Sequence, residues 1–179
     1  MTKPTAEEAR ALFSYDKLTG RLTWRVDRIS KLKRGAVIGG NAIAKARAGE
    51  VAGGIRPDGR RTVVIDGKLY LDSRVAWLIE YGEWPSKQVD HINGNPNDNR
   101  LSNLRLASAS ENGRNRGQQA NNKSGFKGVS WAARERKWNA RIMAQGQYRS
   151  LGYFDTAEQA AEAYAKAAAQ YHGKFARTA

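Results

Sequence analysis

Cysteine is absent from the 179 residues of this chain, and histidine occurs only twice. Without cysteine the chain can form no disulfide, no thiolate nucleophile and no Cys-ligated zinc site, and the absence fits a reducing compartment. No apolar run approaches the roughly 18 residues that cross a membrane, and the first residues lack the apolar core of a signal peptide. We therefore expect a cytoplasmic protein with no membrane partner.

Acidic side chains are also few, because 17 of them stand against 31 lysines and arginines and leave a net charge of +14. Such an excess of positive charge favours a polyanionic partner over an acidic small molecule. The charge alone would equally suit a solvated basic surface or an RNA-binding protein of ribosomal type.

The charge is divided unevenly along the chain. Residues 1–80 carry 16 basic and 9 acidic side chains, residues 81–117 carry 5 and 4, and residues 118–179 carry 10 and 4. The pattern predicts a nearly neutral central module between two modules that grip nucleic acid. We therefore divide the chain into a β-rich contacting region over 1–80, a central module over 81–117, and a linker with a second binding module over 118–179.

Two hairpins are expected in the first region. One spans residues 12–26 around a longer loop, and the other spans residues 61–71 with Asp66 and Gly67 as a two-residue turn. Ser73 is then expected to cap a short helix, which Gly82 and Pro85 end. Residues 28–60 are rich in Gly, Ala, Lys and Arg, and predict loops, short strands and a basic arm.

The last region predicts a small sheet and one helix, after a polar linker at residues 117–125. Three strands are expected at residues 126–131, 137–143 and 147–154. The helix at residues 156–171 begins with Thr156 as N-cap and ends at Gly173. Together with the upstream hairpins, these elements predict the α+β fold class.

The most informative stretch lies between residues 89 and 112. Asp90 and His91 end a strand, and the turn at Asn93 and Gly94 breaks it, which lets both side chains serve one site. A second strand is expected at residues 104–106. A helix capped by Ser108 or Ser110 follows, and Asn112 falls in its first turn.

These residue types suit hydrolysis of a phosphodiester with one hard metal ion. A carboxylate, an amide oxygen and the phosphate oxygens form a donor set that fits Mg²⁺ or Mn²⁺ better than Zn²⁺. His91, left free of the metal, could take a proton from the attacking water, because an imidazole is neutral and basic near physiological pH. No further small-molecule cofactor is indicated. A lone Asp-His pair also occurs in ordinary surface loops, so the ordered set with Asn103 and Asn112 carries the argument.

That ordered set resembles the HNH endonucleases, particularly those of phages and of the intron-associated homing type. The similarity rests on Val89 to Ile92, Asn93 to Pro96, Asn99, Asn103 with Leu104, and Glu111 with Asn112. The run from Gly67 to Pro85 is similar to the segment that precedes the motif in the phage enzymes.

The resemblance implies a ββα-metal nuclease motif over residues 81–117. It makes Asp90 the first metal ligand, His91 the general base and Asn103 the residue that braces the loop. Asn112 becomes the second metal ligand, where many relatives carry His, and this favours magnesium over zinc or nickel. The implied protein is a metal-dependent, site-specific endonuclease acting on double-stranded DNA, in the bacterial cytosol if a phage encodes it.

A second resemblance covers residues 122–177, which are similar to the ethylene-response-factor (APETALA-type) DNA-binding domain. It rests on the runs at residues 124–131, 137–142, 151–156 and 158–175. The resemblance implies a three-stranded sheet that enters the major groove, backed by one helix. By position, its DNA face would include Lys127, Ser130, Trp131, Arg134, Arg136, Trp138, Arg141 and Arg149.

Some alternatives stay open. Many relatives carry Arg at the place of Ser130, so the base preference of this domain should differ from theirs. Trp131 and Trp138 equally suit core packing. His172 is expected to have a structural role. A non-catalytic DNA-binding regulator with a decayed nuclease centre is the alternative function, against which the intact Asp90, His91 and Asn112 argue. One such set and the lack of a heptad repeat predict a monomer that nicks one strand.

Overall fold

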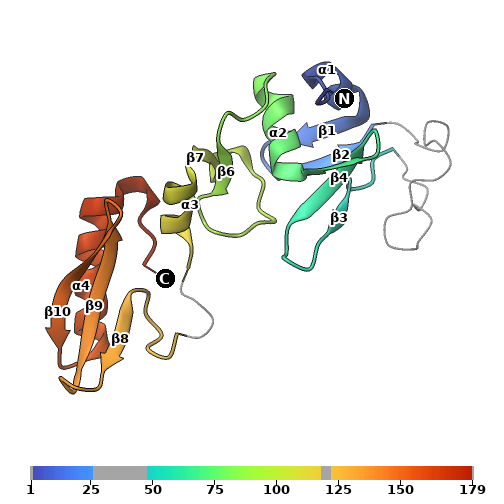
Figure 1. The fold of residues 1–179 in the computed structure, drawn as a ribbon. Coiled ribbons are helices and arrows are strands. Elements are labelled where there is room, and N and C mark those ends of the chain that lie inside the picture. Colours follow the sequence, from blue (N-terminus) through green and yellow to red (C-terminus); the bar gives the residue numbers. More distant parts are fainter. Residues whose placement is uncertain (1, 26–47, 118–121, 179) are drawn as a thin grey trace. The chain divides into compact units, whose positions relative to one another are not determined.

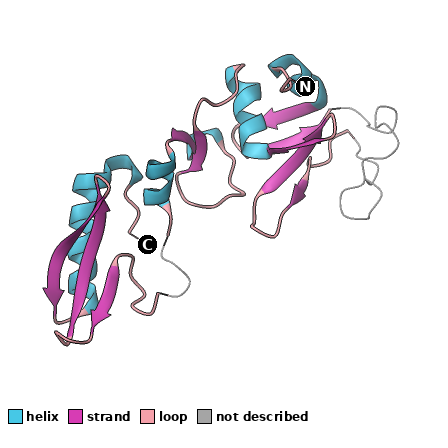
Figure 2. Ribbon diagram, viewed as in Figure 1, coloured by secondary structure: helices cyan, strands magenta, loops and turns pink. Residues whose placement is uncertain are grey.

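The structure, a computed structural model, describes residues 2–25, 48–117 and 122–178. The chain divides into two compact units, Met1–Leu106 and Ala107–Ala179. Each unit combines helices with small antiparallel sheets (Figure 1, Figure 2), which confirms the predicted α+β class. Most of the predicted basic arm and part of the predicted linker lie outside the described residues. No helix within these described ranges is long and apolar enough to span a bilayer.

The first unit begins with a helix that sequence analysis missed, α1 (Ala6–Leu12). Thr5 and Glu8 form a capping box, in which each side chain accepts a hydrogen bond from the other residue's backbone N–H. The expected hairpin follows as β1 (Phe13–Asp16) and β2 (Arg21–Trp24). The rings of Phe13 and Trp24 lie 4.6 Å apart in the core of this unit.

The second predicted hairpin is also confirmed. Strands β3 (Gly54–Ile55), β4 (Arg61–Ile65) and β5 (Lys68–Leu71) form one antiparallel sheet. Asp66 and Gly67 both have positive φ angles, 48° and 77°, as a two-residue primed turn requires.

Helix α2 (Asp72–Tyr81) follows β5 without a loop. The expected cap at Ser73 is wrong: the helix already includes this residue, and the Asp72 carboxylate accepts the Ser73 N–H bond. Gly82, with a φ of 81°, ends the helix as predicted. Helices α1 and α2 pack on each other and both contact β1 (Figure 1), which buries Val75 and Leu78.

The predicted strand–loop–strand segment closes the first unit. Strand β6 (Gln88–His91) pairs with β7 (Leu104–Ala107) in a two-stranded sheet. The loop between them ends in a short 3-10 turn, η2 (Leu101–Asn103). Ser108 then caps α3 (Ala109–Asn115), as one of the two predicted caps.

The second unit contains the predicted three strands and long helix. Strands β8 (Val129–Ala132), β9 (Lys137–Ala144) and β10 (Gln147–Phe154) form an antiparallel sheet with β9 in the centre. Helix α4 (Ala157–His172), capped by Thr156, covers one face of this sheet, and a 3-10 turn, η3 (Gly173–Phe175), follows it (Figure 2).

The core of this second unit lies between the sheet and α4. Ala140 and Ile142 of β9 are buried against Ala160 and Tyr164 of the helix. Strand β8 begins three residues later than expected, because Gly128 has a φ of 72° and the Val129 N–H closes a turn onto the Phe126 carbonyl. Glycine is required at position 128 because a Cβ there would overlap the Tyr164 ring.

Candidate active site

Asp90 and His91 end β6, as predicted, and lie in different environments. Asp90 is 4% exposed, whereas His91 is half-buried, since consecutive strand residues point to opposite faces. Arg105 of β7 places both Nε and Nη2 at 2.8 Å from Oδ2 of Asp90. A buried carboxylate needs such compensation, so this ion pair stabilises the charge of Asp90.

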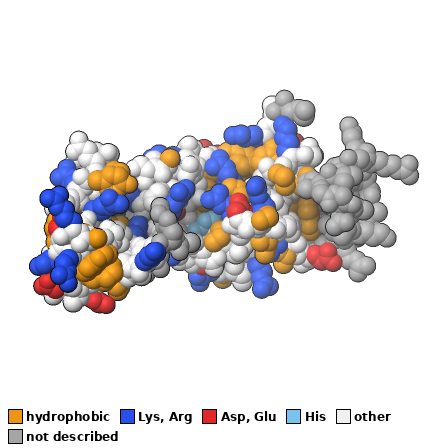
Figure 3. Space-filling model, turned by 60° about the horizontal axis from the view of Figure 1, so that its bottom comes forward, with side chains coloured by type: hydrophobic (Ala, Val, Ile, Leu, Met, Phe, Trp, Pro, Cys, Tyr) orange, Lys and Arg blue, Asp and Glu red, His pale blue; other side chains and the backbone are white. Residues whose placement is uncertain are grey.

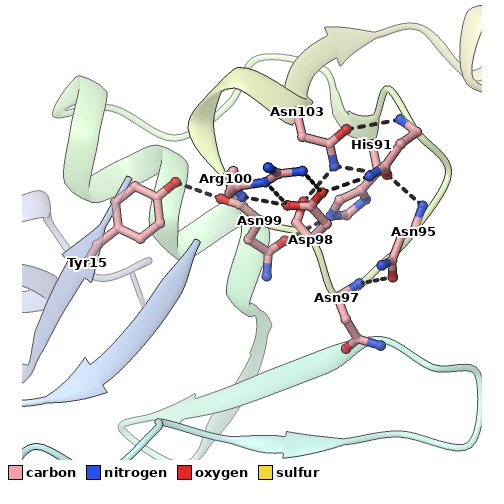
Figure 4. Close-up of polar contacts among 9 residues, drawn as sticks. Tyr15, His91, Asn95, Asn97, Asp98, Asn99, Arg100 and Asn103 are labelled. Atoms are coloured by element: carbon pink, nitrogen blue, oxygen red, sulfur yellow. Dashed lines mark hydrogen bonds and ion pairs between the residues drawn. The ribbon is translucent and has the colours of Figure 1, made fainter. Parts of the chain in front are cut away.

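Two buried side chains hold the imidazole of His91. Its Nε2 lies 2.8 Å from Oδ1 of Asn99 (Figure 4). Asn99 Nδ2 in turn donates a 2.8 Å hydrogen bond to Oδ2 of Asp72. Asn99 is 3% exposed and Asp72 is 5% exposed. Burial raises the pKa of Asp72 to about 6, against opposing hydrogen bonds from Ser73 and Asn99.

Asn103 makes three hydrogen bonds to the loop that precedes it (Figure 4). Its Oδ1 accepts a hydrogen bond from the Asn93 backbone N–H at 3.0 Å. Its Nδ2 donates to Oδ1 of Asn93 at 3.0 Å and to the Asp98 carbonyl at 2.6 Å. One buried amide therefore ties both ends of the 93–98 turn together.

Asp98 orders the outer part of the same loop. Arg100 donates to both oxygens of Asp98, at 2.8 and 2.6 Å, and Asn93 adds a 2.7 Å bond. The hydrogen bonds from Arg100 hold the pKa of Asp98 at about 2. The Asp98 carboxylate thus stays charged near neutral pH and well below it.

The β1–β2 hairpin supports this loop from outside the motif. The Tyr15 hydroxyl donates a 2.7 Å hydrogen bond to the Asn99 carbonyl (Figure 4), and burial raises the Tyr15 pKa. The Leu101 N–H donates to the Lys17 carbonyl at 3.1 Å. Gly20, with a φ of 73°, lies so close to the loop that a Cβ there would overlap the backbone nitrogen of Arg100.

Four of these residues had no role assigned from sequence, namely Asp72, Arg105, Tyr15 and Asn99. Asn99 belongs to the recognised motif, but its partner Asp72 lies 27 positions away and Tyr15 lies 84 positions away. No local pattern in the sequence around Asp72 predicted that its carboxylate would be buried.

Comparison with known proteins identifies the family of this segment. The HNH endonuclease family model matches residues 70–114, which include Asp72, Asp90, His91 and Asn99. Protein 3.8 of Escherichia phage T7 is 38% identical over 89 residues, which cover 50% of this chain and 73% of the phage protein. The chain belongs to the HNH endonuclease family.

A second relative is the uncharacterized HNH endonuclease L560 of Acanthamoeba polyphaga mimivirus, 35% identical over 111 residues. The match covers 62% of this chain, which spans only 57% of the mimivirus protein. No solved structure matches the chain. HNH endonucleases are phosphodiester hydrolases that act on DNA and typically use a divalent metal, so the chain is an enzyme of that class.

The remaining residue of the HNH set, Asn112, lies on α3 in the second unit, whereas Asp90, His91 and Asn103 lie together in the first. Its backbone N–H donates to the Ser108 carbonyl. Lys127 holds the far end of the same helix, with Nζ at 2.5 and 2.6 Å from the carbonyl oxygens of Arg114 and Arg116. Burial lowers the pKa of Lys127 to about 8.

The strand register of the C-terminal sheet places some of the residues predicted to face DNA on the side toward α4. Trp131 pairs with Trp138 on the face toward α4, with ring centroids 5.3 Å apart, and Trp138 packs on the core. Arg149 also lies on this side, opposite Ile142 and 5.4 Å from the Tyr171 ring. Strand alternation therefore places these three side chains on the helix side of the sheet.

The outer face carries a different set of side chains. Ser130 and Arg141 lie on it as expected, and Arg141 packs 5.4 Å from the exposed ring of Tyr148. Arg134 and Arg136 are exposed in the β8–β9 turn, whereas Lys127 is engaged by α3. His172 ends α4 with Nε2 at 2.8 Å from the Met143 carbonyl. Lys and Arg side chains are also numerous over the described face in Figure 3.

Proposed function

We propose that this HNH endonuclease is a metal-dependent, site-specific enzyme of the phage or homing type that cuts double-stranded DNA. One observation carries the proposal. His91 ends β6 directly after the buried Asp90 in the sequence, and its ring nitrogen Nε2 lies 2.8 Å from Oδ1 of Asn99. The net charge of +14 supports a polyanionic substrate.

In the proposed reaction His91 acts as the general base. The ring takes a proton from the water that attacks the scissile phosphate, a role that typically contributes about 10²–10⁴-fold to the rate. Asn103 keeps the loop folded, so the imidazole keeps one orientation while the substrate binds. Arg105 holds the Asp90 carboxylate in place before the substrate arrives.

The residues present fit a hard divalent ion. In the described part of the chain no three His, Asp or Glu side chains gather into a metal site. Mg²⁺ commonly keeps several waters and takes one or two protein oxygens with substrate phosphate. Asp90 and Asn112 would hold Mg²⁺, or Mn²⁺ in its place, and the ion would stabilise charge on the phosphate and the leaving 3′ oxygen.

The second unit is proposed to supply site recognition as an APETALA-type DNA-binding domain. Its three-stranded sheet packed on α4 supports this assignment. The outer face of the sheet, with Arg141 and Ser130, would enter the major groove, where Arg can read guanine edges. Arg134 and Arg136 in the exposed turn would contact phosphates, which position the protein without reading sequence.

The enzyme is proposed to act as a monomer that cuts one strand at each binding event. The chain has one Asp90, His91 and Asn112 set, and one set serves one scissile phosphate. Two DNA-binding regions around it can follow an asymmetric site without a two-fold partner.

A supercoiled-plasmid assay tests the proposal. With Mg²⁺ or Mn²⁺ we expect nicked circles to accumulate first, and EDTA to stop the reaction. The His91→Ala variant should lose about 10²–10⁴-fold in rate and keep its DNA affinity in EDTA, because the imidazole does not grip DNA. Cleavage at the wild-type rate by His91→Ala would remove the assigned base. Direct conversion to linear product with a dimer mass in solution would remove the nicking monomer.

A further inference from the structure

Two hydrogen bonds connect the His91 ring through Asn99 to Asp72, and the reaction proposed above assigns neither of them a role. An imidazole that acts as a base must be neutral, and a neutral ring carries its proton on either Nε2 or Nδ1. Only the nitrogen without the proton can accept one. The partner of the other nitrogen therefore decides which atom is the base.

The contacts that link Asp72, Asn99 and Nε2 of His91 have one consistent order of donors and acceptors. The Asp72 carboxylate can only accept when it is charged, and it lies 2.8 Å from Asn99 Nδ2. That contact turns the amide so that Oδ1, an acceptor, faces His91 Nε2 at 2.8 Å. Nε2 must then carry the proton, and Nδ1 carries the lone pair.

We propose that Asn99 and Asp72 are positioning residues for catalysis: together they hold neutral His91 as the Nε2–H tautomer and make Nδ1 the atom that takes the proton from water. This inference rests on the proposed role of His91 as general base. It adds a carboxylate and an amide to the catalytic arrangement, neither of which touches the DNA or the metal.

The surroundings of Asn99 show why this pair can act as a rigid support. Both side chains are buried, at 3% and 5% exposure, so a lost hydrogen bond would not be replaced easily by water. Asp72 is fixed at the start of α2, where its Oδ1 accepts the Ser73 N–H bond at 2.7 Å. Tyr15 holds the Asn99 backbone from the opposite side through its carbonyl.

The first test removes the amide and measures single-turnover cleavage. Asn99→Ala should lower the rate of the chemical step roughly 10–100-fold, the usual cost of losing a residue that orients an essential histidine, with DNA affinity in EDTA unchanged. Asn97→Ala is the matched control, because Asn97 is an exposed asparagine of the same loop and points away from the ring (Figure 4). It should cut at close to the wild-type rate.

A second test separates positioning from loop folding. If Asn99 acts through His91, then Asn99→Ala added to His91→Ala should cause no further loss of the residual rate. The same fold loss in both backgrounds would overturn the inference. So would a wild-type rate for Asn99→Ala. The proposed function fails separately, if His91→Ala itself is fully active.

The third test needs neither activity nor metal. The ring nitrogen-15 shifts of His91, measured in EDTA at a pH where the ring is neutral, should report the Nε2–H tautomer in the wild type. Both oxygens of Asp72 accept hydrogen bonds, one from the Ser73 N–H and one from Asn99 Nδ2. Asp72→Asn replaces one of these oxygens with an amide donor, so the Asn99 amide is no longer held in one orientation. The His91 ring should then be a mixture of tautomers. A wild-type ring in the Nδ1–H form would overturn the inference, even if every Asn99 variant failed to fold.

Discussion

At the residue scale, the ion pair between Arg105 and Asp90 links stability to metal binding. The side chains of Arg105 and Asp90 are 13% and 4% exposed, so each charge is balanced mainly by the other rather than by solvent. Arg105→Met should destabilise the metal-free protein by about 3–5 kcal/mol, as expected when one partner of a buried pair is removed. On the proposal that Asp90 holds the metal, Arg105 would compete with the cation for the carboxylate, and the variant should also need less Mg²⁺ for half-maximal cleavage.

Urea unfolding in EDTA and a Mg²⁺ titration of the cleavage rate measure these two effects. Arg100→Met is the control, because Arg100 pairs with Asp98 on the surface and is 52% exposed. Its loss should be at most about 1 kcal/mol. An unchanged Mg²⁺ requirement in Arg105→Met would contradict the competition.

Asp72 should give the stability of the protein a recognisable pH dependence. Its pKa rises from 3.8 to about 6 on folding because the carboxyl is buried. The native state then binds the proton more tightly than the unfolded state, so the contribution of Asp72 is present below about pH 4 and is lost as pH rises toward 6. The stability difference between wild type and Asp72→Asn should therefore move in favour of the variant across this window. Urea unfolding at several pH values measures it, and a constant difference would contradict the shift.

At the element scale, the β1–β2 hairpin and the catalytic loop should be stabilised by close packing at Gly20. A Cβ at this position would overlap the backbone nitrogen of Arg100, and the φ of 73° disfavours any side chain. Gly67 has a similar φ of 77° with nothing within 4 Å, so Gly67→Ala reports the backbone strain alone. Gly20→Ala should cost about 1–3 kcal/mol more than Gly67→Ala and should also slow cleavage. If the two variants lose the same stability in thermal unfolding, the catalytic loop accommodates the added Cβ at position 20 with no loss of free energy, which would contradict the prediction.

The two faces of the C-terminal sheet provide a matched pair of arginines. Arg141 is on the outer face, whereas Arg149 lies beside Tyr171 of α4. Arg141→Ala should weaken DNA binding and, if the contact is to phosphate, reduce the slope of log affinity against log salt by about 1. Arg149→Ala should leave the slope unchanged. Fluorescence anisotropy over a salt series distinguishes them, and the opposite result would place DNA on the helix side.

Local sequence signals predicted the elements well where a few neighbouring residues decide the conformation. Asp66 with Gly67 predicted a primed turn, Thr156 predicted a helix start, and Gly82 predicted a helix end, and each of these depends on backbone geometry within one turn. Helix α1 was missed although Thr5 and Glu8 show the spacing of a capping box.

The support of the site could not be predicted in the same way. Asn99 meets Asp72 and Tyr15 only because the packing of α2 and β1 brings them together, and no local pattern records such a meeting. The faces of Trp131 and Arg149 likewise depend on strand register, which a one-residue shift would reverse. Sequence patterns therefore indicated candidate catalytic residues, whereas the residues that hold His91 are seen only in the folded structure.

At the scale of the whole molecule, α3 should depend on residues that follow it. Lys127 bonds the carbonyls of Arg114 and Arg116, and η3 packs on the same helix. Lys127→Met should therefore raise hydrogen exchange at the amides of residues 112–116, with a local loss of about 1–3 kcal/mol. Deletion of residues 118–179 should abolish cleavage as well as weaken binding. A truncated chain that cuts plasmid at the full-length rate would show that α3 needs neither partner.

The boundary between the two units, after Leu106, has a consequence for exchanging modules between nucleases of this kind. A chimera joined at residue 117 would keep Asn112 but replace the lysine that secures its helix, whereas one joined at residue 106 would import a foreign helix together with its own support. A junction at residue 117, in the apparent linker, is thus more disruptive than a junction at residue 106. A library of hybrids should yield active enzymes more often from junctions before Ser108 than from junctions near Gly117.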